Sequence, residues 1–273
     1  MEKPKILFVN QEIYPYVRES QMSKMGRYLP QGIQECGKEI RTFMPKFGTI
    51  NERRNQLHEV IRLSGMNLII NDSDHPLIIK VASIQAARMQ IYFIDNEEYF
   101  HKKNMFHDKN GKFYEDNDEK AVFFARGVIE TIKKLSWTPD IIHCNGWFTS
   151  LVPLYIKKIF KDSPIFANTK IITSLFSDSF EGKFNKTFVD KLKFDNFSSK
   201  DIQPYGEFAF QDLMQAAVDH SDGLVLTAKS GSMTPSILKM VKASHKPVLS
   251  YPGDETYVEG INKFYEKFLS NDK

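Results

Sequence analysis

Cysteines, long apolar runs and clustered basic residues are all scarce in this sequence of 273 residues. The two cysteines, Cys36 and Cys144, lack the spacing of a metal knuckle, so we expect reduced thiols and no metal site. The apolar stretch near the start, residues 5–10, is too short for a signal-peptide core or a membrane span. The chain has 37 basic and 34 acidic residues without a Lys/Arg-rich run, which argues against nucleic acid as a partner. These absences predict a cytoplasmic protein without a membrane partner.

The glycine-rich and nucleophile motifs of well-known enzyme classes are also missing. The sequence contains no Gly-x-Gly-x-x-Gly fingerprint, no P-loop, no nucleophile elbow and no paired-histidine metal motif. We therefore expect no cofactor.

Unbroken apolar runs indicate strands that are covered on both faces, as in a parallel sheet. Such runs occupy residues 5–10, 39–45, 89–95, 140–145, 170–176, 223–228 and 247–251, and amphipathic segments at 22–37, 119–135, 148–160, 207–219 and 255–269 separate several of them. This alternation predicts a Rossmann-like, doubly wound α/β fold with a mostly parallel sheet. The apolar face of segment 255–269 predicts a helix that closes one domain spanning residues 1–273.

Three stretches depart from this alternation. Residues 58–95 contain apolar runs with short breaks, starting at 58–64, which predicts a β-meander inserted after the second core strand. Residues 101–118 are polar and without periodicity, which indicates a mobile surface loop. Residues 181–204 should be irregular, with one short helix near 186–192.

The loop at residues 11–24 has the shape of a phosphate-binding strand–loop–helix unit without its glycines. A helix N-terminus binds phosphate when bare backbone N–H groups can approach the anion. Arg18 could supply a cation, but Glu19 opposes it, and Ser20 and Gln21 add side chains at the approach. Two interpretations remain, a phosphate cradle or a solvated turn before a helix, and the residues favour the turn.

Two later loops also leave strands at the expected ligand-binding edge of the sheet. In the first, His143 could act as an acid, a base or a ligand donor, or could be a hydrogen-bonded core histidine, and Trp147 could stack on a sugar or pack beneath the loop. In the second, Asp178 and Glu181 could share acid–base work, or serve as caps and solvated charges. For both loops the residues favour the structural interpretation.

The order of these segments resembles bacterial glycogen synthases and plant starch synthases. The first 48 residues keep the frame of a strand, Glu-x-x-Pro, a helix and a strand that ends Met-Pro-x-Phe. The stretch at 91–100 is similar to the family's Tyr-Phe-Ile-Asp-Asn strand, and 139–157 is similar to its Pro-Asp-x-x-His-x-His-Asp-Trp stretch. The resemblance runs on to about residue 230 and implies half of a two-Rossmann-domain glycosyltransferase.

The differences from the family fall on its functional positions. By resemblance, Arg18 stands for the lysine that meets the donor phosphate, and Ser20 and Gln21 stand for two glycines. Other matched positions are Phe106 for a tyrosine, Asn145 and Gly146 for the histidine and aspartate of the His-Asp-Trp motif, Phe176 for the active-site histidine, and Phe180, Glu181 and Gly182 for Tyr-Gln-Gly. His143 and Trp147 are retained. The catalytic positions would be Asn145, Gly146 and Phe176, the donor-phosphate loop Arg18, Ser20 and Gln21, and the sugar site His143, Trp147, Phe106 and Glu181.

The resemblance implies transfer of glucose, with retention, from ADP-glucose or UDP-glucose to an α-1,4-glucan, so an α-glucan or a sugar nucleotide is the implied partner. The family's second domain, which supplies most of the nucleotide site, has no counterpart in the sequence. Our hypothesis is a synthase-like pseudoenzyme of glycogen metabolism that is inactive alone or dependent on a partner chain. The alternative is a non-catalytic module that binds α-glucan or another protein.

Overall fold

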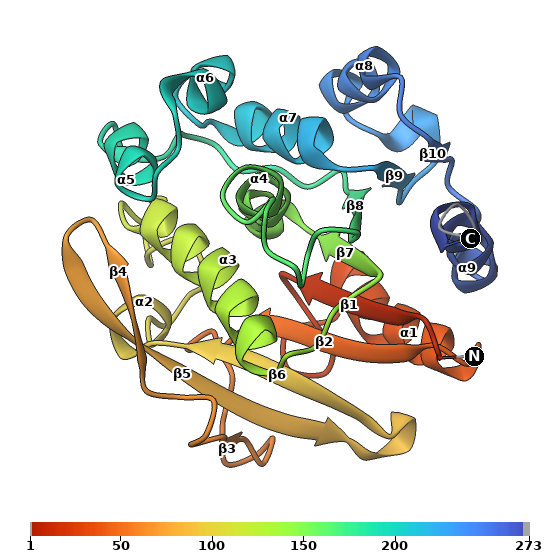
Figure 1. The fold of residues 1–273 in the computed structure, drawn as a ribbon, viewed down its shortest axis with the longest axis horizontal. Coiled ribbons are helices and arrows are strands. Elements are labelled where there is room, and N and C mark those ends of the chain that lie inside the picture. Colours follow the sequence, from red (N-terminus) through yellow and green to blue (C-terminus); the bar gives the residue numbers. More distant parts are fainter. Residues whose placement is uncertain (1, 270–273) are drawn as a thin grey trace.

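A ten-stranded sheet runs through the computed structural model, which describes residues 2–269 (Figure 1). The strands are β1 (Lys5–Asn10), β2 (Glu39–Pro45), β3 (His58–Glu59), β4 (Met66–Ile70), β5 (Ser73–Ile84), β6 (Met89–Asp95), β7 (Ile141–Asn145), β8 (Lys170–Leu175), β9 (Gly223–Leu226) and β10 (Val248–Leu249). They lie in the order β10-β9-β8-β7-β1-β2-β6-β5-β3, and β4 pairs with β5. All pairs from β10 to β6 are parallel, so the mixed, mostly parallel α/β fold is confirmed.

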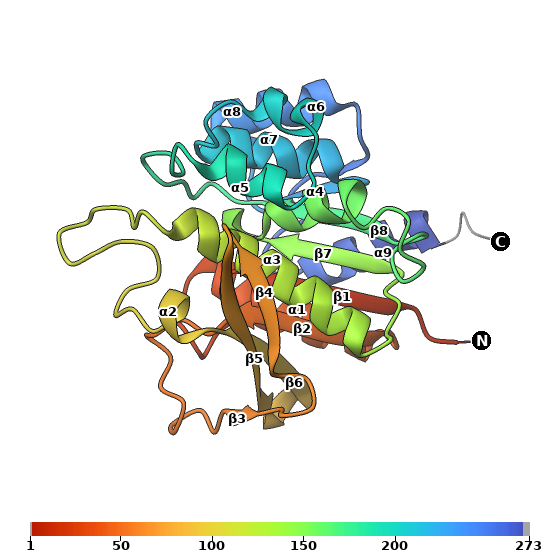
Figure 2. The same cartoon turned by 60° about the vertical axis from the view of Figure 1, so that its left-hand side comes forward.

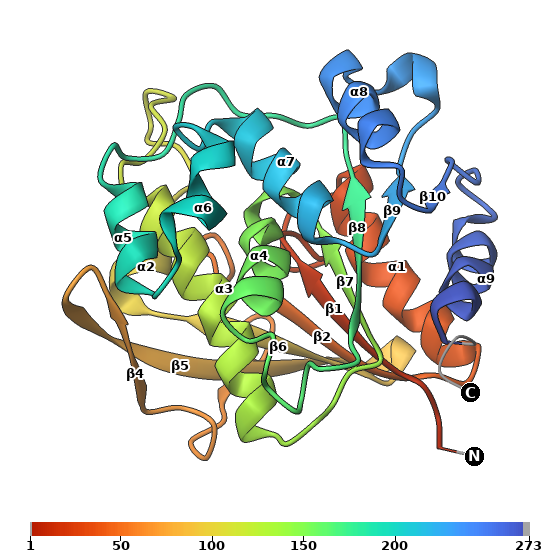
Figure 3. The same ribbon diagram turned by 45° about the horizontal axis from the view of Figure 1, so that its top comes forward.

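Helices cover both faces of the sheet (Figures 1 and 3). They are α1 (Gln21–Glu35), α2 (Glu97–Phe100), α3 (Asn117–Lys134), α4 (Leu151–Lys158), α5 (Phe188–Phe194), α6 (Ser199–Ile202), α7 (Phe210–His220), α8 (Pro235–Ser244) and α9 (Tyr257–Leu269). On one face α3, α4, α7 and α8 enclose the larger apolar core, while α1 and α9 lie side by side on the other face over a smaller one. Burial on both faces explains why the central strands are continuously apolar.

Strand β7 contributes side chains to both apolar cores. Its residues are all buried, and successive side chains point to opposite faces. Ile142 and Cys144 belong to the larger core, whereas Ile141 packs in the smaller core beneath α1 and α9. His143 also lies on that second face, against Tyr265 of α9.

Residues 58–95 contain β3 to β6, with antiparallel pairing of β5 to β3, β4 and β6. The prediction of a strand at 58–64 is wrong in its extent, because only His58 and Glu59 pair with β5. The long hairpin is instead β4–β5, joined at Asn71 and Asp72, both with positive φ. Two such residues between apolar strands are typical of a tight hairpin turn.

The irregular segments differ from expectation mainly at their ends. The loop expected at 101–118 ends at Asp116, because α3 begins at Asn117, whose side chain donates to the Phe106 carbonyl (2.7 Å). The helix expected near 186–192 is α5, two residues later, and α6 and α8 were not expected. Figure 2 shows the α2–α3 loop projecting beside the loop after β8. Helix α9 follows its predicted segment, and the domain predicted at 1–273 extends past the described residues at both ends.

Candidate functional site

Side chains occupy the start of α1, where the sequence left a phosphate cradle open as one interpretation. Ser20 caps the helix, since its Oγ accepts from the Ser23 N–H (2.9 Å). The same hydroxyl donates to Glu12 Oε2 (2.8 Å). A carboxylate therefore already lies beside the helix N-terminus, whose partial positive charge favours anions.

Gln21 and Glu19 further restrict this helix start. The Gln21 side chain donates to the Thr227 carbonyl (2.6 Å) just after β9, so it links α1 to the end of a neighbouring strand. Glu19 pairs with the Lys24 ammonium at 2.6 Å, so a carboxylate already lies beside this lysine of the first helical turn. Arg18 is exposed, and within residues 2–269 its guanidinium has no hydrogen-bond or ion-pair partner.

Gly146 follows β7 at the same edge and has no room for a side chain. Its φ of 91° favours glycine, and a Cβ there would lie 2.7 Å from both Gln11 Cβ and Met22 Sδ. Gln11 is held in that place because its Oε1 accepts from the Phe148 N–H (3.1 Å). The neighbouring Asn145 is fully buried and donates to Asn10 Oδ1 (2.7 Å).

Trp147 lies in a cluster of aromatic rings beneath two loops. The ring centroid of Phe106 lies 4.7 Å from that of Trp147, and the centroid of Phe180 lies 4.5 Å from it. Phe113 stacks on Phe180 at 4.6 Å with an interplanar angle of 8°, which joins the α2–α3 loop to the loop after β8. Phe184 also contacts Trp147, Phe113 and Phe180. With 4% exposure, the Trp147 face is covered by protein.

His143 and Phe176 lie on the opposite face of the sheet from this aromatic cluster. His143 Nε2 is 2.6 Å from Ser174 Oγ, and Nδ1 contacts the Tyr265 hydroxyl of α9. Complete burial lowers the pKa of His143 to about 3, so the imidazole is neutral at physiological pH. Phe176 is 5% exposed and belongs to the smaller apolar core. Both side chains are structural parts of that core.

The two carboxylates after β8, Asp178 and Glu181, differ in their surroundings. Desolvation and the charge of Glu12 raise the pKa of Asp178 to about 6, although the side chain keeps contact with solvent. Glu181 is exposed, and among the described residues its carboxylate has no hydrogen-bond or ion-pair partner. Asp178 is therefore electrostatically coupled to the α1 start, whereas Glu181 is separate from it.

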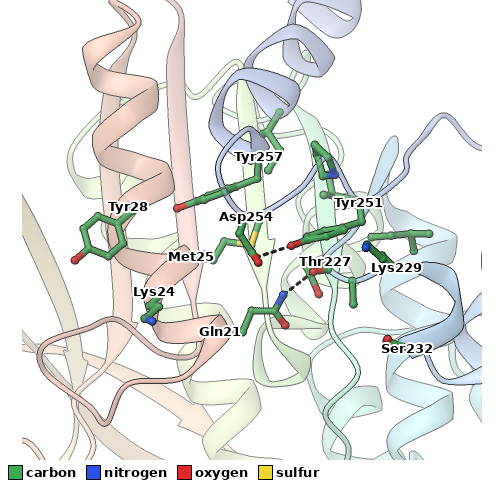
Figure 4. Close-up of a pocket in the computed structure, with 15 residues that line it drawn as sticks. Gln21, Lys24, Met25, Tyr28, Thr227, Lys229, Ser232, Tyr251, Asp254 and Tyr257 are labelled. Carbon is green, nitrogen blue, oxygen red and sulfur yellow. Dashed lines mark hydrogen bonds between the residues drawn. The ribbon is translucent and has the colours of Figure 1, made fainter.

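A cavity of about 920 Å³ lies between α1, the end of β9 and the start of α9 (Figure 4). Its lining residues are Gln21, Lys24, Met25, Tyr28, Val225, Leu226, Thr227, Ala228, Lys229, Ser232, Tyr251, Pro252, Asp254, Tyr257 and Ile261. We call this cavity the α1–α9 pocket. Sequence reasoning missed it, apart from Gln21, because Tyr257 was read as part of an apolar helix face and Tyr251 and Asp254 belong to no motif.

Away from the α1–α9 pocket, two carboxylates and one histidine lie close enough together to be candidate metal ligands. Ligand atoms of Glu52, Asp95 and His101 lie within 4.8 Å of one another. The Lys46 ammonium is 2.5 Å from Glu52, and the Lys80 ammonium is 2.8 Å from both Glu52 and Asp95. These two cations already balance the carboxylates, so the group fits an ion-pair network better than a metal centre.

The structure brings some of the predicted site residues together and separates others. Ser20 and Gln21 lie at one helix start, and Gly146 is packed against Met22 of the same helix. Phe106 and Trp147 contact each other in the aromatic cluster. Gln11, which fills the space beside Gly146, was missed because no motif in the sequence marks it.

Comparison with known proteins agrees with this fold. A family described as starch synthase catalytic domain matches residues 5–240. The glycogen synthase of Chlorobium limicola is 34% identical over 226 residues, which cover 82% of this chain and 46% of that protein. That of Chlorobium phaeobacteroides is 31% identical over 268 residues, covering 98% and 51%. The chain spans about half the length of these curated relatives.

A solved structure gives the same answer for the fold. It is the catalytic domain of starch synthase IV from Arabidopsis thaliana bound to ADP and acarbose. The TM-score is 0.73 at 13% identity, and the match covers 92% of this chain and 51% of the other. Among residues 2–269, no helix combines the length and apolar character needed to cross a bilayer.

Proposed function

This chain belongs to the glycogen and starch synthase family, and from that premise we propose that it acts in α-glucan metabolism without transferring glucose by itself. The relatives are named glycogen synthase, and the solved starch synthase domain holds ADP and acarbose. A sugar nucleotide and an α-glucan are therefore the ligands to weigh for this chain.

One observation carries the proposal: side chains fill the start of α1. A diphosphate needs uncovered N–H groups or unpaired cations in that place. Here Ser20 binds Glu12, Gln21 reaches across to Thr227, and Lys24 is paired with Glu19. In this loop Arg18 is an exposed cation that no carboxylate of the described residues pairs with.

The positions that the resemblance assigns to chemistry support the same conclusion. Asn145 and Phe176 are buried, and neither is a titratable group. Gly146 has no side chain and no space for one. Removing one group that stabilises transition-state charge typically costs on the order of 10²–10³ in rate, so changes at several such positions should abolish measurable transfer.

The test is a glucose-transfer assay on the purified chain. ADP-[14C]glucose and, separately, UDP-[14C]glucose are incubated with glycogen, and the glycogen synthase of Chlorobium limicola serves as the positive control. We expect incorporation at the level of a blank without protein. Incorporation clearly above that blank would overturn the proposal.

A second candidate function is an α-glucan-binding module, and the open α1–α9 pocket favours it. Ligand sites in α/β folds form outside the carboxyl ends of strands, where this pocket lies. Co-sedimentation with glycogen tests the module directly. Retention of the chain in the glycogen pellet supports the module. If the chain is not retained and transfers no glucose, a protein partner is indicated instead.

A further inference from the structure

We propose that a second cavity, at the amino edge of the sheet, binds a small phosphate monoester, an inference that goes beyond the proposed function. The cavity has a volume of about 500 Å³ and lies at the amino ends of the parallel neighbours β1, β2 and β6. Its lining residues are Lys3, Gln34, Lys38, Glu39, Ile40, Arg41, Arg88, Met89, Gln90 and Tyr92. We call it the amino-edge pocket. The α1–α9 pocket and the donor-phosphate loop lie at the ends of strands on the opposite edge, so the amino-edge pocket is a separate place on the molecule.

The lining of the amino-edge pocket has a surplus of positive charge. Four of its residues are lysines or arginines, and Glu39 is its one acid. The Lys38 ammonium is already paired with Glu266 Oε1 at 2.7 Å. The other three cations and Glu39 leave a surplus of two positive charges. A phosphate monoester carries about 1.5 to 2 negative charges at pH 7, which matches this surplus.

Arg41 lines the pocket, and within residues 2–269 its guanidinium forms no ion pair. Its Nη1 donates to the Tyr92 hydroxyl (2.7 Å), and the ring centroids of Tyr92 and Trp137 lie 5.7 and 5.2 Å from the guanidinium carbon. These contacts orient the group without neutralising its charge. The Nε atom is buried and has no hydrogen-bond partner among the described residues. A planar guanidinium with N–H groups to spare is well suited to bind two phosphate oxygens at once.

Lys3 and Arg88 bring two further cations to the pocket from distant segments of the chain. Both side chains are exposed, and neither has a hydrogen-bond or ion-pair partner in the part of the chain that the structure describes. Arg88 has a φ of 49° in the turn between β5 and β6, a conformation that glycine or asparagine adopts more readily than arginine. Three unpaired cations from separate segments therefore meet at one cavity.

Glu39 and the size of the cavity narrow the ligand class. The Glu39 carboxylate is held in the lining because it accepts from Trp137 Nε1 (2.5 Å). A second phosphate group would add negative charge that the three cations do not balance, which disfavours a nucleoside diphosphate. The volume lies in the range of small-molecule sites, and Ile40, Met89 and Tyr92 give the lining apolar surface for an organic group. A small organic monoester therefore fits better than the free phosphate ion.

The experiment titrates the full chain with ribose 5-phosphate by calorimetry, and separately with inorganic phosphate, ribose and ADP. The test variant combines Lys3→Ala with Arg88→Ala. The matched control combines Lys103→Ala with Arg62→Ala, which also removes one exposed lysine and one exposed arginine, but outside the lining. Arg41→Lys is a second variant that keeps the positive charge and loses the planar group.

We expect ribose 5-phosphate to bind more tightly than inorganic phosphate, and ribose not to bind. The test variant should weaken binding about fivefold, because each exposed charge pair contributes modestly. Arg41→Lys should weaken it about tenfold, and the control should leave it unchanged.

Absence of ribose 5-phosphate binding to the wild-type chain would overturn the inference, as would binding that the test variant leaves unchanged. Binding of inorganic phosphate alone would also overturn it. The same holds for ADP binding that is tighter than that of ribose 5-phosphate and is weakened by the test variant. The glucose-transfer assay tests the proposed function separately, so the two failures are distinguishable.

Discussion

The carboxyl edge of the sheet is closed on the side of the larger core, over β7 and β8, but open on the other side, between α1, the end of β9 and the start of α9. Over β7 and β8, Trp147 lies under Phe106, Phe113 and Phe180, and rings from two loops pack together. Between α1 and α9 the edge keeps the α1–α9 pocket, whose lining includes three tyrosines, two lysines and one aspartate. The comparison teaches that strand ends place loops at one edge, whereas the loop side chains decide whether that edge becomes core or binding site.

Truncating Trp147 should produce the largest effect, because its ring joins the two loops. Trp147→Ala is expected to lower the free energy of unfolding by about 3–5 kcal/mol. Urea denaturation measures this loss. Phe194→Ala, at a ring that is 47% exposed, serves as the control with a much smaller change. Equal losses in the two variants would show that the aromatic cluster is not a core.

Gly146 and Gly37 form a matched pair that separates backbone strain from crowding. Their φ values are 91° and 89°, but a Cβ on Gly37 meets nothing within 4 Å. Gly37→Ala should therefore cost about 1–2 kcal/mol of strain. Gly146→Ala should cost about 1–3 kcal/mol more, because the methyl group collides with Gln11 and Met22. If the two variants had similar melting curves, the claim that Gln11 and Met22 fill the space beside Gly146 would be contradicted.

Acid should destabilise the chain partly through His143. In the unfolded chain the imidazole takes up a proton below its ordinary pKa of 6.5, while in the folded chain it does so only near 3. The unfolded state thus binds more protons between these values, and the free energy of unfolding falls by about 1.4 kcal/mol per pH unit as the pH drops. His143→Gln should remove this slope between pH 6 and pH 5, measured by urea denaturation. The exposed His58→Gln should keep it.

The smallest expected effect concerns the carboxylates at the α1 start. The Glu12 charge helps to raise the pKa of Asp178 to about 6, so Glu12→Gln should lower that pKa. Carboxyl carbon NMR shifts, followed during a pH titration, measure the change. Glu19→Gln removes an exposed charge from the same loop, and we expect it to leave Asp178 unaltered.

Much of the fold could be predicted because apolar runs and amphipathic segments report burial directly. The parallel strands and α9 follow from this pattern, and so does the loop position of residues 18–20. The β4–β5 hairpin was not predicted, because its signal is two turn residues, Asn71 and Asp72, within a long apolar region. The α1–α9 pocket could not be predicted, because it forms where Gln21, Thr227 and Tyr257 meet from distant parts of the chain.

The candidate site could be predicted only in part, because its contacts also join distant parts of the chain. The missing glycines at Ser20 and Gln21 are visible in the sequence, whereas the hydrogen bonds that these side chains make with Glu12 and Thr227 need the structure. The packing of Gln11 against Gly146 likewise depends on two strands that are distant in sequence.

Calorimetric titration of the chain with ADP tests the central claim most directly, since the claim is that side chains occupy the place of a diphosphate at the start of α1. We predict no binding heat up to millimolar ADP, with the Chlorobium limicola glycogen synthase as the positive control. Micromolar binding that is lost in Arg18→Ala would contradict the claim.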